Sequence, residues 1–290
     1  MTKKLLNELK KYEEENNHQK VIESVDSIIK KDSKTTPLLY DKCIALMNLK
    51  KYNEAAECLK EYLKVCDDDE KYEIYSTLAI CYHNIDNNEL EEKYLLKAFE
   101  EQPDNHNITK RITYFYYLQQ KYETCIKFIN ILIKKDLADI KDYTNLTSSY
   151  MALGNIEKTI EFANLILDID PNNVDTYITL SRAYEEADDE ENLKKTCQKI
   201  INLEDDGTAE LLLLKAQSYV QLGEEEKGIE LIDNLIKKEP SNPFAHLMKG
   251  SIYNQIGKTE QADECFREAI MLEPSLFESE DIKNKFDKSQ

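Results

Sequence analysis

The chain has 290 residues, a third of them are charged, and the formal net charge is −19. An acidic balance of this size argues against nucleic acid and membrane surfaces as partners, because both are bound by basic faces. The seven cysteines are an odd number without a CxxC pair, and no apolar run is long enough for a secretion signal or a membrane span. We therefore expect a cytoplasmic protein that binds no nucleic acid and does not insert into membranes.

Apolar residues recur at intervals of three and four along the chain, as in YITLSRAY (177–184) and LLLLKAQSY (211–219). This is the period of an amphipathic α-helix, and signals for β-strands are weak. Glycine and proline are scarce, with six of each, and no segment rich in glycine or serine marks a domain boundary. The pattern predicts an all-α protein organised as a single domain.

One pattern of 34 residues repeats along almost the whole chain. Two consecutive copies show it best, because Tyr, Leu and Tyr fall at positions 4, 7 and 11 in both (Tyr143, Leu146, Tyr150; Tyr177, Leu180, Tyr184). The copies, in chain order, are 2–35, 36–69, 72–105, 106–139, 140–173, 174–207, 209–242 and 243–276. A period of this length predicts helix–turn–helix units that stack in a row.

Residues that typically end helices recur at fixed positions of the 34-residue copies. Position 15 holds Gly154, Gly223 and Gly257, where a residue that tolerates positive φ would end the first helix of a unit. Position 32 holds a proline in four copies, where the second helix must stop: Pro103, Pro171, Pro240 and Pro274. Position 8 holds small or slim residues, which predicts a close approach of the two helices: Cys43, Ala79, Thr113, Thr147, Ser181, Ala216 and Gly250.

The stretch LDIDPNNV (167–174) contains Asp168, Asp170 and Asn172 at alternating positions, as at the start of a calcium-binding loop. Such a loop also needs glycine at its sixth position and glutamate at its twelfth, where this chain has Asn173 and Thr179. The other turns with a proline at the same repeat position, EEQPDN (100–105), KKEPSN (237–242) and MLEPSL (271–276), do not keep this alternating pattern. We interpret the stretch as a turn between repeats and expect no metal site there.

The repeat resembles the tetratricopeptide repeat, a 34-residue helix–turn–helix unit, over residues 2–276. The resemblance implies a right-handed superhelical solenoid of antiparallel helix pairs, with the first helix of each pair on the inside. Some copies depart from the family pattern: 2–35 has no turn proline, 72–105 has Glu91 at position 20, where alanine is usual, and 209–242 has Lys215 at position 7. The last segment, 277–290, places Ile282 and Phe286 four residues apart, and we expect a capping helix there.

Nothing in the sequence points to catalysis or to a cofactor. The four histidines are scattered, no HExxH, G-x-S-x-G, phosphate-binding or dinucleotide-binding motif occurs, and the cysteines and serines lack a nearby histidine base. Cys43, Cys125 and Cys197 fall at packing positions of the repeat, where we expect small buried side chains. The sequence therefore predicts a protein that is not an enzyme.

The resemblance implies that a partner is bound by inward-facing residues of the first helices. In the copies from 106 to 207, the residues expected at these positions are Asn107, Lys110, Tyr114, Tyr117, Lys141, Asn145, Ser148 and Arg182. Three cations beside tyrosines would suit a peptide with acidic side chains or a C-terminal carboxylate. The alternative is that these are ordinary solvated residues.

The carboxylate clamp of chaperone-binding tetratricopeptide domains fits this region only in part. Lys110 and Asn145 match it, whereas Tyr114, Asp175 and Thr179 do not. We expect a non-catalytic scaffold or adaptor that holds a partner peptide or protein segment in its concave groove. Two alternatives remain open: a peptide-responsive regulatory subunit of an enzyme or transcription factor, and a non-catalytic subunit of a larger assembly.

Overall fold

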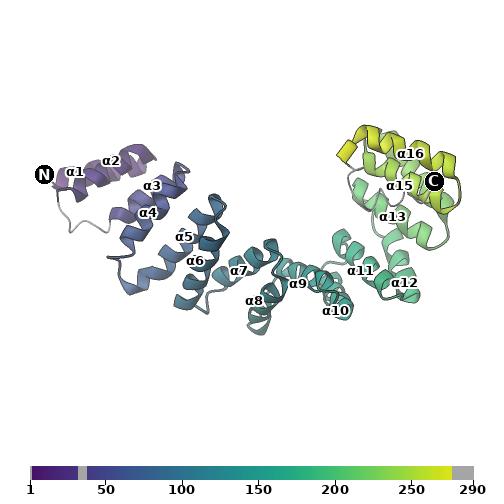
Figure 1. Cartoon of the computed structure of the whole chain (residues 1–290), viewed down its shortest axis with the longest axis horizontal. Helices are drawn as coiled ribbons and strands as arrows, with labels where there is room; N and C mark the ends of the chain where they lie inside the picture. The colour runs from purple at the N-terminus through teal and green to yellow at the C-terminus, as the bar shows by residue number, and fades with distance from the viewer. Residues whose placement is uncertain (1, 32–37, 276–290) are drawn as a thin grey trace. The chain divides into compact units, whose positions relative to one another are not determined.

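The computed structural model describes residues 2–31 and 38–275, and in these ranges it contains sixteen α-helices and no strand (Figure 1). The helices are α1 (Thr2–Glu14), α2 (His18–Ile29), α3 (Leu39–Asn48), α4 (Tyr52–Tyr62), α5 (Lys71–Asn84), α6 (Asn88–Glu101), α7 (His106–Leu118), α8 (Tyr122–Lys134), α9 (Ile140–Ala152), α10 (Ile156–Ile169), α11 (Val174–Glu186), α12 (Glu190–Ile201), α13 (Ala209–Gln221), α14 (Glu225–Lys238), α15 (Pro243–Gln255) and α16 (Thr259–Leu272). A short 3-10 helix, η2 (Asp68–Glu70), precedes α5. The all-α repeat fold is thus confirmed.

The chain divides into two compact units, Met1–Asn145 and Leu146–Gln290. Each expected 34-residue copy contains two α-helices, which we call its first and second helix. The helix α5 begins one residue before the start of its copy, 72–105. That all copies form one continuous domain stays a prediction. The capping helix expected at 277–290 lies outside the described residues.

Within each unit, helices pack against their neighbours in sequence. In the first unit, contacts join every consecutive pair from α1 to α8. In the second, they join every consecutive pair from α10 to α16, and α13 also contacts the first helices on either side of it, α11 and α15. This nearest-neighbour pattern is that of a repeat array, in which each pair is stabilised by the next.

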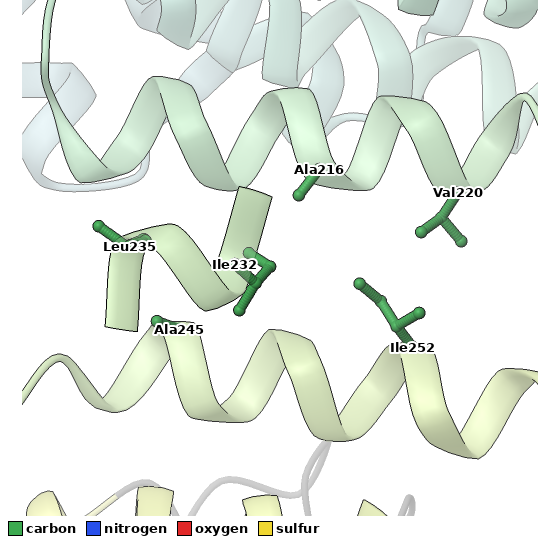
Figure 2. Packing of buried hydrophobic residues seen from close by; sticks show 6 residues of the cluster. All are labelled: Ala216, Val220, Ile232, Leu235, Ala245 and Ile252. Atoms are coloured by element: carbon green, nitrogen blue, oxygen red, sulfur yellow. The ribbon is translucent and has the colours of Figure 1, made fainter. Parts of the chain in front are cut away.

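The buried core crosses from one helix pair to the next. Figure 2 shows one cluster, in which side chains from α13 and α14 meet side chains from α15 of the following pair: Ala216, Val220, Ile232, Leu235, Ala245 and Ile252. Two further clusters also cross from one pair to the next, one over α1, α2 and α3 and one over α10, α11 and α12. Cys43, Cys125 and Cys197 are buried, as expected from their repeat positions.

The turn inside each pair has one conformation in all eight copies. Position 15 has positive φ throughout, in three copies as glycine and in five as another residue: Asn16, Lys50, Asp86, Gln120 and Asp188. The next backbone N–H donates back across the turn to position 11, as Lys121 does to the carbonyl of Tyr116 at 2.9 Å. This bond closes a Schellman-type end, for which glycine is the least strained residue.

The DIDPNN stretch is a turn between α10 and α11. Asp170 accepts a hydrogen bond from the backbone N–H of Asn172 at 3.2 Å, and Asn173 caps α11 by accepting from the N–H of Thr176 at 3.0 Å. Lys215, the unusual residue at position 7, donates from its ammonium to the carbonyl of Leu203 at 2.5 Å. A lysine is tolerated there because it satisfies a carbonyl just beyond the end of α12.

Replacing a strained residue at position 15 with glycine should stabilise the protein. Gln120 has φ of 54°, and we expect Gln120→Gly to raise the free energy of unfolding by about 1 kcal/mol, since glycine adopts this conformation without steric cost. The same change at exposed Lys127, inside α8, should lower it by about 1 kcal/mol. Urea unfolding followed by circular dichroism compares the two, and equal losses would contradict the turn assignment.

Close packing at position 8 predicts a second stability effect. A Cβ atom added to Gly250 would lie 2.7 Å from two ring carbons of Phe266, whose side chain is buried. We expect Gly250→Ala to destabilise the protein by about 1–3 kcal/mol because the ring has no free space to move into. Adding Phe266→Leu should recover part of this loss in a double-mutant cycle, whereas additive losses would argue against the contact.

Candidate functional site

The eight residues expected to contact a partner all lie on first helices, and none is buried. Four of them line one hollow of ≈ 500 Å³ in the first unit: Lys110, Tyr114, Lys141 and Asn145. Asn107 and Tyr117 are also on α7, where the Tyr117 ring meets the edge of Tyr122 with centroids 6.3 Å apart. Ser148 on α9 and Arg182 on α11 belong to the second unit.

The charge of this hollow is balanced. The Lys110 ammonium lies 2.5 Å from a carboxylate oxygen of Asp139 and 3.4 Å from one of Asp142. Its hydrogen bond to Asp139 raises the pKa of Lys110. Lys141 is exposed, and its ammonium takes part in none of the ion pairs between described residues. Two lysines thus accompany two carboxylates, and the local excess of positive charge expected from the sequence is not found in the first unit.

Both carboxylates are held by the start of α9. Asp139 accepts hydrogen bonds from the backbone N–H groups of Lys141 at 2.9 Å and Asp142 at 3.1 Å, and Asp142 accepts one from the N–H of Asp139 at 2.9 Å. This reciprocal pair is a capping box, and burial raises the pKa of Asp142. The D-x-x-D spacing signals the cap in the sequence, but no local signal shows that it lies against Lys110 of the preceding copy.

The first unit also exposes a row of apolar side chains, of which the sequence analysis named only Tyr114. Position 9 of three consecutive first helices holds Ile44, Ile80 and Tyr114, with 37%, 38% and 54% of their surfaces exposed. Ile80 and Tyr114 line a second hollow of ≈ 420 Å³ together with Leu118, which is 49% exposed. Exposed apolar side chains at one repeat position, beside a hollow, indicate a surface that partners can cover.

A buried carboxylate lies in this second hollow. Glu91 is only 6% exposed, and its carboxylate lies 3.2 Å from Nδ1 of His83. Burial raises the pKa of Glu91, partly offset by His83 and by the Arg111 guanidinium nearby. The Arg111 guanidinium donates to the hydroxyl of Ser76 at 2.7 Å and to its carbonyl at 3.2 Å, and burial lowers its pKa. The departure from alanine at position 20 is therefore accommodated by polar neighbours.

Glu91 should make stability depend on pH. Its pKa is higher in the folded chain than the ordinary value of 4.5, so the ionised form costs stability at neutral pH and the cost disappears as the pH falls. We expect Glu91→Gln, which keeps an acceptor for His83, to raise the unfolding free energy at pH 7, with a gain that shrinks towards pH 4.5. Urea titrations across this range test it, and a loss of stability at pH 7 would show that pairing outweighs burial.

The second unit contains a larger groove, of ≈ 640 Å³, which we call the second-unit groove. Its lining comes from α11, α13, α15 and the turn before α15, and most of it is apolar. The apolar side chains are Ile178, Leu213, Leu214, Phe244 and Met248. Arg182, Glu185 and Glu210 add exposed charges. The volume and apolar lining are those of ligand sites.

One polar group of this groove lacks a partner. The hydroxyl oxygen of Ser181 is buried and makes no hydrogen bond within the described part of the chain. Of the groove's residues, only Arg182 was selected from the sequence. The signal for the rest was present, because Ile178 and Leu213 share position 5 and Leu214 and Met248 share position 6 of their copies. Ile178 and Glu185 already fall at inward-facing positions of copy 174–207, but Leu213, Leu214 and Met248 could be found only by following these positions into the last two copies.

Between residues 2–31 and 38–275, no helix is long and apolar enough to cross a membrane. In the same ranges, no three His, Cys, Asp or Glu side chains are grouped so as to hold a metal ion.

Comparisons with known proteins agree with this architecture. The family model described as "Psidin, N-terminal TPR repeats region" matches residues 10–125, and the model "Tetratricopeptide repeat" matches residues 245–276. A search of curated proteins found no match. Tetratricopeptide repeats are typically non-catalytic modules for protein interaction.

Several solved structures share the fold at low sequence identity. The C-terminal part of a TPR repeat-containing protein from Cytophaga hutchinsonii has a TM-score of 0.58 and 15% identity, with 92% of this chain and 95% of that chain covered. A tetratricopeptide repeat protein from Parabacteroides merdae has a TM-score of 0.51 and 13% identity, with 93% and 98% covered.

A chain in a structure of Naa15/Naa10 bound to HypK-THB has a TM-score of 0.54 and 17% identity, and the match covers 87% of this chain. It covers 39% of that chain, so the present protein spans about two fifths of its length. The solved structures share the fold of this chain, and the two family models with the repeated helix pairs show that it is a tetratricopeptide repeat protein.

Proposed function

We propose that this protein is a non-catalytic scaffold that holds segments of partner proteins against its first helices. We call the exposed sides of α3, α5 and α7 in the first unit, and of α11, α13 and α15 in the second, the first-helix face of each unit. The observation that carries the proposal is the exposed apolar row Ile44, Ile80 and Tyr114, three side chains at one repeat position, of which Ile80 and Tyr114 line a hollow. Burying such side chains against a partner releases water and favours association.

The polar residues expected from the sequence would then fix the orientation of the partner. In the first unit we propose Asn107, Tyr117, Lys141 and Asn145 as polar contacts around Tyr114. In the second unit we propose Ser148 as a polar contact, and Arg182 as the residue whose charge decides which side chains a partner can place beside it. Lys110 contributes less, because Asp139 and Asp142 already bind its ammonium. An acidic or C-terminal carboxylate partner is supported only by Lys141 and Arg182, so its preference over other partners is weaker than the sequence suggested.

The family supports a role in protein interaction, and seven cysteines, an odd number without a CxxC pair, suit a reducing compartment such as the cytoplasm. The match to a structure of Naa15/Naa10 bound to HypK-THB supports a second candidate, a non-catalytic subunit of a larger assembly, because a chain of this fold occurs there in a complex. A peptide-responsive regulatory subunit is a further possibility. Small-angle scattering with and without a partner separates these roles, since the regulatory subunit should change its dimensions on binding.

Loss of the apolar row should abolish partner capture without unfolding the chain. In an affinity capture from a lysate of its source cells, we expect Ile80→Asp combined with Tyr114→Asp to reduce recovery of the first unit's partners by about tenfold or more, the loss typical of central apolar anchors. The control replaces exposed Lys127 and Lys134 of second helix α8 with aspartate. Circular dichroism confirms folding, and undiminished capture by the Ile80/Tyr114 variant would overturn this placement of the site.

A further inference from the structure

We propose that the second-unit groove binds a basic amphipathic helical segment of another protein. This inference rests on the proposed function, because it assigns a partner chemistry to the first-helix face of the second unit. Three consecutive first helices, α11, α13 and α15, supply the groove, and α13 contacts both of the others. Figure 2 shows how α13 and α15 are joined through buried side chains of α14, so two walls of the groove are held by the core.

The apolar part of the groove requires an apolar side of the partner. Phe244 is 54% exposed at the start of α15 and lines the groove with half-buried Ile178 and Met248. An exposed phenylalanine beside a concave apolar surface loses water when another apolar side chain covers it. Anchors at successive turns of a helix would fit a groove that successive repeats line, which is the helix-in-groove mode of recognition.

The charges around the groove require a basic partner. Glu185 and Glu210 line it with exposed carboxylates, against the single cation Arg182. From residue 146 to 275 the second unit has 26 acidic and 12 basic side chains, so its field is strongly negative. Several of its lysines are engaged within the protein, among them Lys215 with a carbonyl and Lys249 with Asp233. A segment rich in lysine or arginine is therefore attracted, and an acidic one is repelled.

Charge also separates the proposed occupant from two others. Residues 277–290 of this chain carry four acidic side chains against three lysines, so this segment does not complement an acidic groove. A second copy of the chain, at −19, would be repelled as well.

The test uses the full-length chain and three fluorescein-labelled peptides of about 16 residues. The first has leucine at helical i, i+3, i+4 and i+7 positions and lysine elsewhere; the second has glutamate in place of lysine; the third scrambles the first. Fluorescence anisotropy at physiological salt should show the first peptide binding at least about tenfold more tightly than either of the others. Equal binding of the scrambled peptide would mean charge attraction alone and would overturn the proposal.

Single substitutions test where the peptide binds and which peptide charge the groove prefers. Phe244→Ala should lower the affinity for the leucine–lysine peptide about tenfold, the loss expected for an aromatic anchor. The control Met271→Ala on α16 also removes an exposed apolar side chain and should leave this affinity unchanged. Arg182→Ala should tighten binding about threefold by removing the one opposing charge. Weaker binding by Arg182→Ala, with preference for the glutamate peptide, would assign the groove to acidic partners instead.

Sedimentation of the free chain tests the remaining occupant. If the protein is a dimer that Phe244→Ala dissociates, the groove holds a second copy and the proposal fails. Failure here is distinct from failure of the scaffold function. If partner capture depends on Ile80 and Tyr114 but the binding of no peptide depends on Phe244, only the assignment of the second-unit groove is wrong. If the peptides bind as expected but partner capture does not depend on Ile80 and Tyr114, the proposed site in the first unit is wrong.

Discussion

The structure depends on one constraint: a pair of helices cannot bury its own apolar surface. The described core clusters therefore join the second helix of one pair to the first helix of the next, as Ala245 and Ile252 of α15 join Ile232 and Leu235 of α14. Each first helix is thus covered on one side by its own pair and by the preceding one, while another side stays exposed. The exposed sides, repeated along the chain, are where the hollows of both units are found.

The same constraint explains the uniform turns. Stacking works only if every pair has the same geometry, so position 15 keeps positive φ even where the residue is Lys50 or Gln120 and the conformation costs energy. The polar departures from the pattern are accommodated locally. Lys215 satisfies a carbonyl just after α12, and the Glu91 carboxylate lies against His83. Neither changes the order in which the helices pack.

The sequence predicted the fold because its signals are local and periodic. Tyr177, Leu180 and Gly154 each mark a repeat position, and the helices begin and end where these positions indicate. The site was less predictable. Lys110 was expected to supply positive charge, but the cap of the next first helix places Asp139 and Asp142 against it, and these residues are 29 and 32 positions away along the chain. Likewise, the second-unit groove requires side chains from three copies, so no single copy signals it.

The central claim is that partners bind the exposed sides of the first helices. Hydrogen–deuterium exchange of the full chain, with and without a captured partner, tests it most directly. Covering these sides should slow amide exchange in α5 and α7, or in α11, α13 and α15, and leave second helices such as α8 and α16 unchanged. Slower exchange confined to second helices would place the binding surface on the opposite side of the repeats and contradict the account.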